Sequence, residues 1–228
     1  MKCLESIKRA IHDPVALKDY QIIVVDRYSD DRTVDSVYAT IPFAMVLQSR
    51  AGRGKARNFG VENALGEILI FLDSDIEIKP DTLQRMANHL KEHDAVIGTY
   101  STEHPYSNFA SQYKNLFVHY TYISAPRYVN WFFSAIGAVR KEVFKRLGGF
   151  RDFEAGEDIE FGQRIGQVYS AKDIQVVHHH CYTLAELLKN DFCRARNWVK
   201  MFMTIRKEHK TFDKGGFANA TWGLIASV

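Results

Sequence analysis

The sequence predicts an α/β fold in which helices cover both faces of a central sheet. Short runs of β-branched and other apolar residues alternate along the chain with stretches of helical periodicity. Several runs are apolar at nearly every position, which is typical of strands buried on both faces. Together these two observations predict a Rossmann-like three-layer sandwich with a mostly parallel central sheet, whose ligands bind beyond the carboxyl ends of the strands.

The first half of the chain supplies most of this alternation. Leu4, Ile7 and Ile11 have helical spacing, and Gln21 to Asp26 is a β-branched run that ends in a carboxylate. Pro80 and Asp81 stand where a helix would begin. The expected elements are helices over 3–11, 57–65 and from about 82 to 90, and strands over 21–26, 43–47 and 67–72.

The second half continues the pattern with strands over 95–99, 133–140 and 174–177 and a helix over 157–165. The aromatic-rich stretch 100–130 is expected to form one wall of a pocket. A last helix over 183–207 is expected to place one broad apolar face on the core, formed by Leu184, Leu187, Leu188, Ala195, Val199 and Phe202.

Length and composition favour one globular domain. The chain has 228 residues, 46% of them hydrophobic, and a net charge of only +3. Its three cysteines lack metal-finger spacing and are odd in number, so they are expected to be reduced thiols, which favours a cytoplasmic protein. The predicted domains are a catalytic region over 1–210 and a tail over 211–228, whose apolar end would fit the start of a membrane segment but is too short to identify one.

The strongest chemical signal is the run Ile68 to Asp75, in which a buried strand delivers two carboxylates, Asp73 and Asp75, to the edge of the sheet. A hard divalent cation prefers such oxygen ligands and shares its coordination with substrate phosphates. The alternative is that both acids cap the turn that follows. By itself an Asp-x-Asp pair does not decide between the two.

Four other segments favour the functional interpretation. They are Val25-Asp26; Gly52 followed by Ala56-Arg57-Asn58; Gly148-Gly149-Phe150; and Glu157-Asp158. In this order, and with Asp73-Ser74-Asp75 between the second and third, they resemble family 2 glycosyltransferases of the GT-A fold over roughly residues 1 to 200. Each motif is weak alone, but five in order are specific.

The resemblance implies a nucleotide-sugar donor and a divalent metal, Mg²⁺ or Mn²⁺. It implies that Asp26 contacts the nucleoside base, that Arg57 reaches the base or diphosphate, and that Asp73 and Asp75 bind the nucleotide and its metal. A basic side chain near a helix start suits a diphosphate, and a metal neutralises the leaving group as the glycosidic bond breaks. Outside this set of motifs, Arg57 would be interpreted as a surface ion pair and Asp26 as a turn residue.

By the same resemblance, Asp158 is the general base that takes the proton of the acceptor hydroxyl, and Gly149, Phe150 and Glu157 lie on the acceptor side. The acidic neighbour Glu157 is expected to raise the pKa of the base. Alternatively, these acids form the favourable first turn of a helix, a role that is compatible with catalysis. The implied reaction is transfer with inversion to a sugar, glycan or glycolipid acceptor in polysaccharide or glycolipid synthesis, including that of the cell envelope.

Three consecutive histidines follow the strand over 174–177, where the family often has a metal ligand. We favour His178, with His180 second, because alternation along an extended strand puts these two on one face and His179 on the other. A structural or solvated histidine is the alternative for each.

Two departures from the family pattern stand out. The first strand of the family, with its Pro-x-Tyr-Asn-like segment, is absent, and N-terminal truncation is the favoured interpretation. Arg27 stands where the family commonly has an acid. The rival functions are a non-catalytic or degenerate sugar-nucleotide-binding domain and, less favoured, a phosphatase of the haloacid dehalogenase type with Asp73 as nucleophile.

Basic residues concentrate near the end of the chain, with eight Lys or Arg against three Asp or Glu over 189–214. No nucleic-acid recognition motif accompanies them, so no nucleic-acid partner is expected. A basic helix before an apolar end fits peripheral contact with the cytosolic face of an anionic membrane. The alternative is an ordinary solvated face. The residues proposed to face the membrane are Lys189, Arg194, Arg196, Lys200, Arg206 and Lys207.

Overall fold

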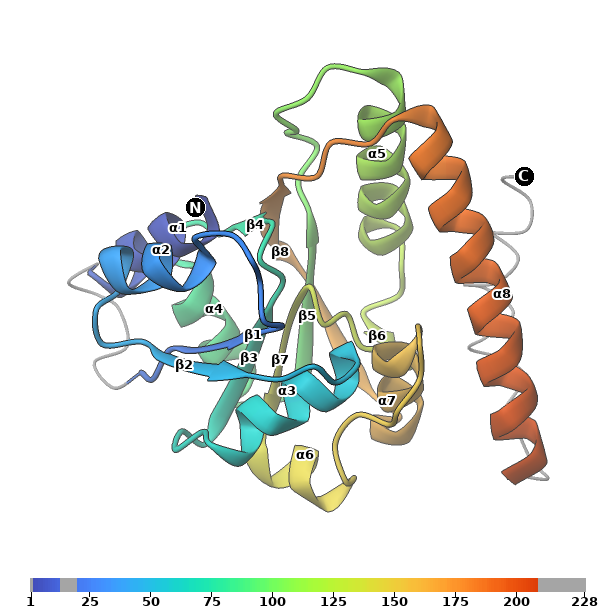
Figure 1. The fold of residues 1–228 in the computed structure, drawn as a ribbon. Helices are drawn as coiled ribbons and strands as arrows, with labels where there is room; N and C mark the ends of the chain where they lie inside the picture. The colour runs from blue at the N-terminus through green and yellow to red at the C-terminus, as the bar shows by residue number, and fades with distance from the viewer. Residues whose placement is uncertain (1, 13–19, 209–228) are drawn as a thin grey trace.

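The computed structural model describes residues 2–12 and 20–208 (Figure 1). The predicted tail over 211–228 lies outside these residues. The helices are α1 (Lys2–Ile11), α2 (Thr33–Thr40), α3 (Arg53–Glu62), α4 (Thr82–His89), α5 (Phe109–Ile123), α6 (Lys141–Arg146), α7 (Glu157–Ile165) and α8 (Leu184–Glu208). The strands are β1 (Ile23–Asp26), β2 (Met45–Gln48), β3 (Ile68–Leu72), β4 (Ile76–Glu77), β5 (Ala95–Tyr100), β6 (Tyr128–Val129), β7 (Ile136–Arg140) and β8 (Val168–His178).

Two hydrophobic cores, one on each face of the sheet, confirm the three-layer α/β class. Alternate residues of β3 divide between them: Ile70 and Leu72 pack against the core that includes α1, α2 and α4, whereas Leu69 and Phe71 belong to the core with α3, α6 and α7. This is the side-chain alternation of a strand covered on both faces.

The strand directions are mixed. β1 and β2 pair in parallel, and β5 pairs in parallel with β8. β7 lies between β3 and β5 and runs antiparallel to both, while β4 and β6 pair antiparallel with β8. Strands β3, β5 and β8 therefore share one direction. β7 begins where β3 ends, because Ile136 pairs with Leu72. The segment that leads into β7 is thus placed at the edge expected to hold ligands.

The structure corrects the apolar face that was predicted for the last helix, α8. It stands outside the sandwich next to α5 (Figure 1). The side chains that it buries are Leu187, Met201 and Ile205, whereas Leu184, Leu188 and Val199 are more than half exposed. The helix carries apolar residues on several sides, so periodicity alone did not identify the packed side.

A glycine allows α8 to pack closely against the start of α7. Gly156, just before α7, has a φ of +86°, and a β-carbon there would lie 2.8 Å from the Sδ atom of Met201 and 3.4 Å from a ring atom of Trp198. The positive φ favours glycine, and a β-carbon there would also require the Met201 side chain to shift. The close approach brings one side of α8 over the first turn of the helix that carries Asp158.

Candidate active site

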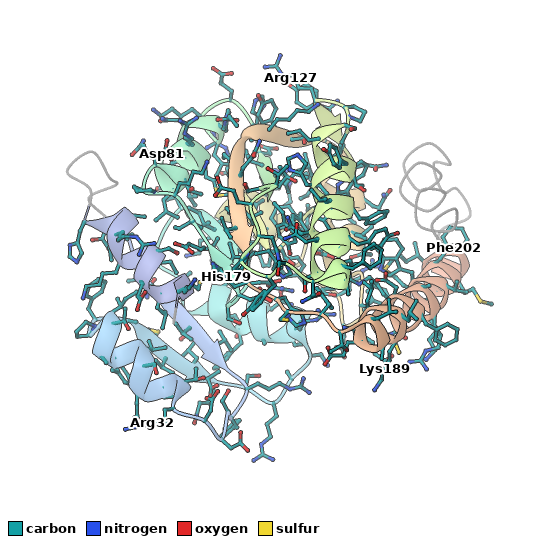
Figure 2. The ribbon with its side chains drawn as sticks, turned by 90° about the horizontal axis from the view of Figure 1, so that it is seen from above. Arg32, Asp81, Arg127, His179, Lys189 and Phe202 are labelled. Atoms are coloured by element: carbon teal, nitrogen blue, oxygen red, sulfur yellow. The ribbon has the colours of Figure 1, made fainter. Side chains whose placement is uncertain are left out.

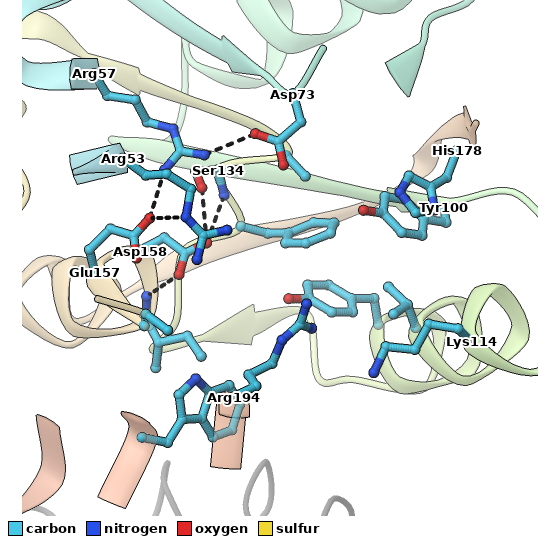
Figure 3. Close-up of a pocket in the computed structure, with 18 of the residues that line it drawn as sticks. Arg53, Arg57, Asp73, Tyr100, Lys114, Ser134, Glu157, Asp158, His178 and Arg194 are labelled. Carbon is cyan, nitrogen blue, oxygen red and sulfur yellow. Dashed lines mark hydrogen bonds and ion pairs between the residues drawn. The ribbon is translucent and has the colours of Figure 1, made fainter. Parts of the chain in front are cut away.

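A pocket of about 160 Å³ opens at the carboxyl edge of the sheet (Figure 3). Five of the predicted site residues line it: Arg57, Asp73, Glu157, Asp158 and His178. The predicted aromatic stretch contributes Tyr100, Val118 and Tyr122, together with Lys114, so it does form one wall of the pocket. Asp26, Asp75, Gly149 and Phe150 do not line the pocket.

Arg57 links two of the motifs. Its Nη2 atom donates to Asp73 Oδ1 at 2.9 Å, and its Nη1 atom donates to Glu157 Oε1 at 2.8 Å (Figure 3). The Arg57 and Glu157 side chains are 17% and 4% exposed, so this ion pair is largely shielded from water. The arginine expected at the base or diphosphate thus also fixes the two acids relative to each other. Its contact with a nucleotide stays a prediction.

The next residue, Asn58, holds the Gly-Gly-Phe segment. Its Nδ2 atom donates to the carbonyl of Phe150 at 2.8 Å, and its Oδ1 atom accepts from the Phe150 amide at 3.0 Å. Gly149 has a φ of +69°, and a β-carbon there would lie 2.7 Å from Asn58 Oδ1. Asn58 and Gly149 therefore fit together only when position 149 lacks a side chain.

Phe150 packs in the hydrophobic core. The residue is 3% exposed, and its ring lies within 5.3 Å, centroid to centroid, of the rings of Phe71, Phe144 and Phe161. The ring is enclosed in the core and does not line the pocket, and the predicted acceptor-side place of Phe150 stays a prediction. Its apolar side chain is needed in the core, while its backbone anchors α3. The same backbone role describes Gly149 better than acceptor contact does.

Asp158 lies in the first turn of α7 with its carboxylate held from two sides. Its Oδ2 atom accepts from the Ser134 hydroxyl at 2.9 Å and from the Ser134 amide at 3.3 Å, and its Oδ1 atom accepts from the Ile159 amide at 2.9 Å. A carboxylate has about four lone-pair positions, so acceptor capacity remains. The carboxylate is thus oriented by fixed donors inside the pocket, as a general base requires.

Glu157, the residue before the expected base, has a raised pKa. Burial raises the pKa of Glu157 and the charge of Asp158 raises it further, whereas Arg53 and Arg57 act in the opposite direction. Glu157 is the more buried of the two acids and accepts from Arg57. We therefore interpret Glu157 as the partner that positions Arg57.

Asp26 is buried at the end of β1. Its carboxylate accepts from the Ser29 hydroxyl at 2.6 Å, from the Ser29 amide, and from Gln48 Nε2 at 3.3 Å. The hydrogen bond from the Ser29 hydroxyl is the largest cause that lowers its pKa. In this arrangement Asp26 holds the turn after β1 and ties it to β2. Its predicted contact with a nucleoside base is not tested by this geometry.

The histidines divide between two faces as the alternation predicts. His178 Nε2 and His180 Nδ1 lie 3.4 Å and 3.6 Å from Asp75 Oδ2, while His179 Nε2 lies 2.7 Å from Glu77 Oε2. His178 is buried and stacks on Tyr100, whereas His180 is exposed.

These groups suit a metal that relies on its substrate for further ligands. Within residues 2–12 and 20–208, no group of three or more His, Cys, Asp or Glu side chains is arranged to hold an ion alone. Asp75 and His178 nevertheless converge closely enough to share a cation. Mg²⁺ typically takes one or two protein carboxylates together with substrate phosphates and water, so the Asp75 carboxylate fits this mode.

Three site residues were missed at the sequence level. Arg53 lies 3.9 Å from Glu157, Ser134 orients Asp158, and Arg194 lines the pocket from α8. Arg53 could have been found from its place at the start of the helix after Gly52. Ser134 gave no signal, because an isolated serine before a strand has no distinctive pattern.

The family can now be identified from comparisons with known proteins. A model of the family described as "Glycosyl transferase family 2" matches residues 1–148, more than half of the chain. The chain belongs to glycosyl transferase family 2. The match includes Asp26, Arg57 and Asp73-Ser74-Asp75, and it ends before Glu157. This assignment rules out the alternative in which Asp73 is the nucleophile of a phosphatase.

Curated relatives of this family 2 chain match over part of its length. EpsH of Bacillus subtilis is 36% identical over 106 residues, which are 44% of this chain and 29% of EpsH. The poly(ribitol-phosphate) beta-glucosyltransferase of Bacillus spizizenii is 30% identical over 102 residues, 42% of this chain and 16% of that protein. The matches thus span less than a third of these relatives.

Solved structures confirm the GT-A fold. The mannosyltransferase PcManGT from Pyrobaculum calidifontis, solved with GDP-Man and Mn²⁺, has a TM-score of 0.65 at 20% identity over 98% of this chain and 64% of its own. At that identity the likeness establishes the fold, and the ligands belong to PcManGT.

Proposed function

We propose that residues 1–210 form the catalytic domain of a glycosyltransferase that moves a sugar from a nucleotide-diphosphate sugar to an acceptor hydroxyl with inversion. The observation that carries this proposal is the position of Asp158, whose carboxylate is oriented by Ser134 in the same pocket as Arg57 and Asp73. The pocket thus combines the proposed general base, Asp158, with Arg57 and Asp73, the arginine and the aspartate that are expected to bind the nucleotide diphosphate.

In the proposed reaction, Asp158 takes the proton of the acceptor hydroxyl as its oxygen bonds to the anomeric carbon. The bond from that carbon to the diphosphate oxygen breaks, and its electron pair leaves with the nucleoside diphosphate. Arg53 lines the pocket and is available for the diphosphate because its side chain is 63% exposed. A bound Mg²⁺ or Mn²⁺, held by Asp75 and His178, would stabilise charge on the leaving group.

The relatives favour a role in polymer or envelope synthesis. Besides the poly(ribitol-phosphate) glucosyltransferase, they include the succinoglycan biosynthesis protein ExoO of Rhizobium meliloti, 38% identical over 88 residues. We propose an acceptor of the same broad class, a glycan, polysaccharide or glycolipid.

A thermal-shift screen of nucleoside diphosphates with and without Mn²⁺ tests the proposal. A ligand bound only by the native state at 100 times its Kd adds about 2.7 kcal/mol of stability. We expect metal-dependent stabilisation by at least one nucleotide, lost in Asp75→Asn. Asp81→Asn is the matched control, because Asp81 pairs with Arg85 on α4 instead. No stabilisation by any nucleotide would contradict donor binding. Stabilisation without turnover on any nucleotide sugar would favour the non-catalytic alternative.

We also propose peripheral membrane contact through α8 on the cytoplasmic side. Leu188, Phe192 and Val199 are exposed on this helix, and Lys189, labelled in Figure 2, is exposed on the same helix. In the described part of the chain, no helix is both long and apolar enough to cross a membrane. Exposed apolar side chains beside basic ones suit an anionic surface. Of the basic residues first assigned to this surface, Arg194 instead lines the pocket, and the side chains of Arg206 and Lys207 lie outside the described residues.

Co-sedimentation with vesicles tests this contact. We expect binding to anionic vesicles that weakens with salt and with Phe192→Ser, and little binding to neutral vesicles. Tyr38→Ser is the control, because Tyr38 is an exposed aromatic residue on α2. Equal absence from both pellets would leave α8 as an ordinary protein surface.

A further inference from the structure

The wall of the pocket formed by α5 and α8 carries two cations and one carboxylate. Lys114 of α5 is buried, and its Nζ atom lies 2.5 Å from Asp191 Oδ1 of α8. Arg194 follows Asp191 by three residues and lines the same pocket. Among the residues that the structure describes, Arg194 makes no hydrogen bond or ion pair, so this wall keeps one uncompensated positive charge.

The two cations lie apart from the groups proposed to bind the donor. Figure 3 shows Arg194 and Lys114 on the side of the pocket away from Asp73 and Arg57, with Arg194 directed toward the interior. Asp158 lies on the wall between these two regions. An anion on Arg194 would therefore face the base from the side opposite the nucleotide, where an acceptor must enter for inversion.

The packing of α8 fixes this arrangement. Met201 and Trp198 contact Gly156 directly before the helix that carries Asp158, and Leu187 is buried on the same side of α8. Trp198 and Tyr182 also line the pocket. Arg194 thus lies on a helix that is packed in place, and aromatic side chains line the same pocket. Ligand pockets commonly combine polar and aromatic groups in this way.

The positive charges of Lys114 and Arg194 repel each other, and the Asp191 carboxylate acts against this repulsion. Burial lowers the pKa of Lys114, and the charge of Arg194 lowers it further, against the effect of Asp191. A bound anion would offset this repulsion. Arginine suits phosphate in particular, because its planar guanidinium donates two parallel hydrogen bonds to phosphate oxygens.

We propose that Lys114 and Arg194 form a phosphate-binding subsite for the acceptor, so that the acceptor carries a phosphate group close to the hydroxyl that receives the sugar. The subsite rests on the proposed transferase function. Its chemistry suits a phosphate monoester or diester, which either a lipid-linked acceptor or a water-soluble phosphorylated glycan or polyol would supply.

Calorimetric titration with glycerol phosphate, and with glycerol as the neutral match, tests the subsite. The titration is run with Mn²⁺ and a saturating amount of the stabilising nucleoside diphosphate, which occupies the donor side. We expect glycerol phosphate to bind, glycerol not to bind, and Arg194→Gln to raise the Kd for glycerol phosphate by about tenfold, as expected for loss of a charge-assisted contact. Arg194→Lys should restore part of the affinity, because it keeps the charge but loses the planar donors.

Arg196→Gln is the matched control, since Arg196 lies on the same helix, contacts Asn197 and does not line the pocket. Octyl phosphate distinguishes the sources: tighter binding than glycerol phosphate indicates a lipid phosphate, and equal binding indicates a water-soluble one. Absence of glycerol phosphate binding, or equal weakening by Arg194→Gln and Arg196→Gln, would overturn the subsite. If nucleotide stabilisation persists in that case, the proposed function stands and only the subsite falls.

Discussion

Arg57 donates a hydrogen bond to Glu157 at 2.8 Å, although the two residues lie 100 positions apart in the chain. The same guanidinium reaches Asp73 after β3. One side chain therefore connects the middle of α3, the Asp-x-Asp segment and the start of α7, the three places from which the candidate site is built. The geometry of the site depends on this ion-pair network as well as on the sheet.

Removing the guanidinium should destabilise the fold, because it leaves the buried carboxylate of Glu157 without its main partner. We expect Arg57→Gln to lower the free energy of unfolding by roughly 3 kcal/mol, the range for breaking a buried ion pair. Urea unfolding measures this change. Arg53→Gln is the control, because Arg53 is 63% exposed and 3.9 Å from Glu157, and it should cost less than about 1 kcal/mol. Equal effects of the two variants would mean that the Arg57 pair adds no more stability than the exposed Arg53 contact.

The close packing of α8 against the start of α7 can be tested by substituting Gly156. Gly156→Ala should destabilise the protein by about 2 kcal/mol or more, through backbone strain and a clash with Met201. Gly148→Ala is the matched control: its φ is +75°, but a β-carbon there meets no atom within 4 Å, so only the strain applies. Thermal unfolding compares the two. A cost for Gly156→Ala no larger than that for Gly148→Ala would argue against close packing of α8.

The hydrogen bond between Ser29 and Asp26 should make stability depend on pH. Because this bond lowers the pKa of Asp26 from its ordinary 3.8, its contribution is present above that pH and is lost as the pH falls through the lower pKa of the folded state. We expect Ser29→Ala to cost roughly 1.5–3 kcal/mol at neutral pH, as for hydrogen bonds to charged groups, and less in strong acid.

Urea unfolding of both proteins across this range measures the difference. In an Asp26→Asn background, Ser29→Ala should lose its pH dependence, because no carboxylate titrates at position 26. A cost of Ser29→Ala that stays constant with pH would show that the hydroxyl acts through something other than the ionised Asp26.

The parts of the site that were predicted are those fixed by local rules. Asp73 follows an apolar strand, and the ends of like-directed strands meet at one edge of a sheet, so its place at the site follows from the sequence. The bounds of α7 were predicted as found, because acidic residues suit the first turn of a helix. The division of His178 and His179 between opposite faces follows from strand alternation.

The parts that were missed depend on contacts between distant segments. Nothing local indicates that Arg57 would pair with Glu157, or that Ser134 would orient Asp158. Phe150 was assigned to the acceptor side by its motif, and its burial in the aromatic core was not predicted. On α8, the close fit of Met201 against Gly156 selected the packed side, and this placed Arg194 in the pocket.

The central claim is that Asp158 is the base of a sugar transfer, and release of nucleoside diphosphate from nucleotide sugars in the presence of Mn²⁺ tests it most directly. Asp158→Asn should lower turnover by at least about 100-fold, the usual contribution of a general base, while the affinity for the nucleoside diphosphate stays unchanged. Asp152→Asn is the control, because Asp152 pairs with Lys55 on the surface, and it should keep wild-type turnover. Turnover of Asp158→Asn at the rate of the Asp152→Asn control would contradict the account.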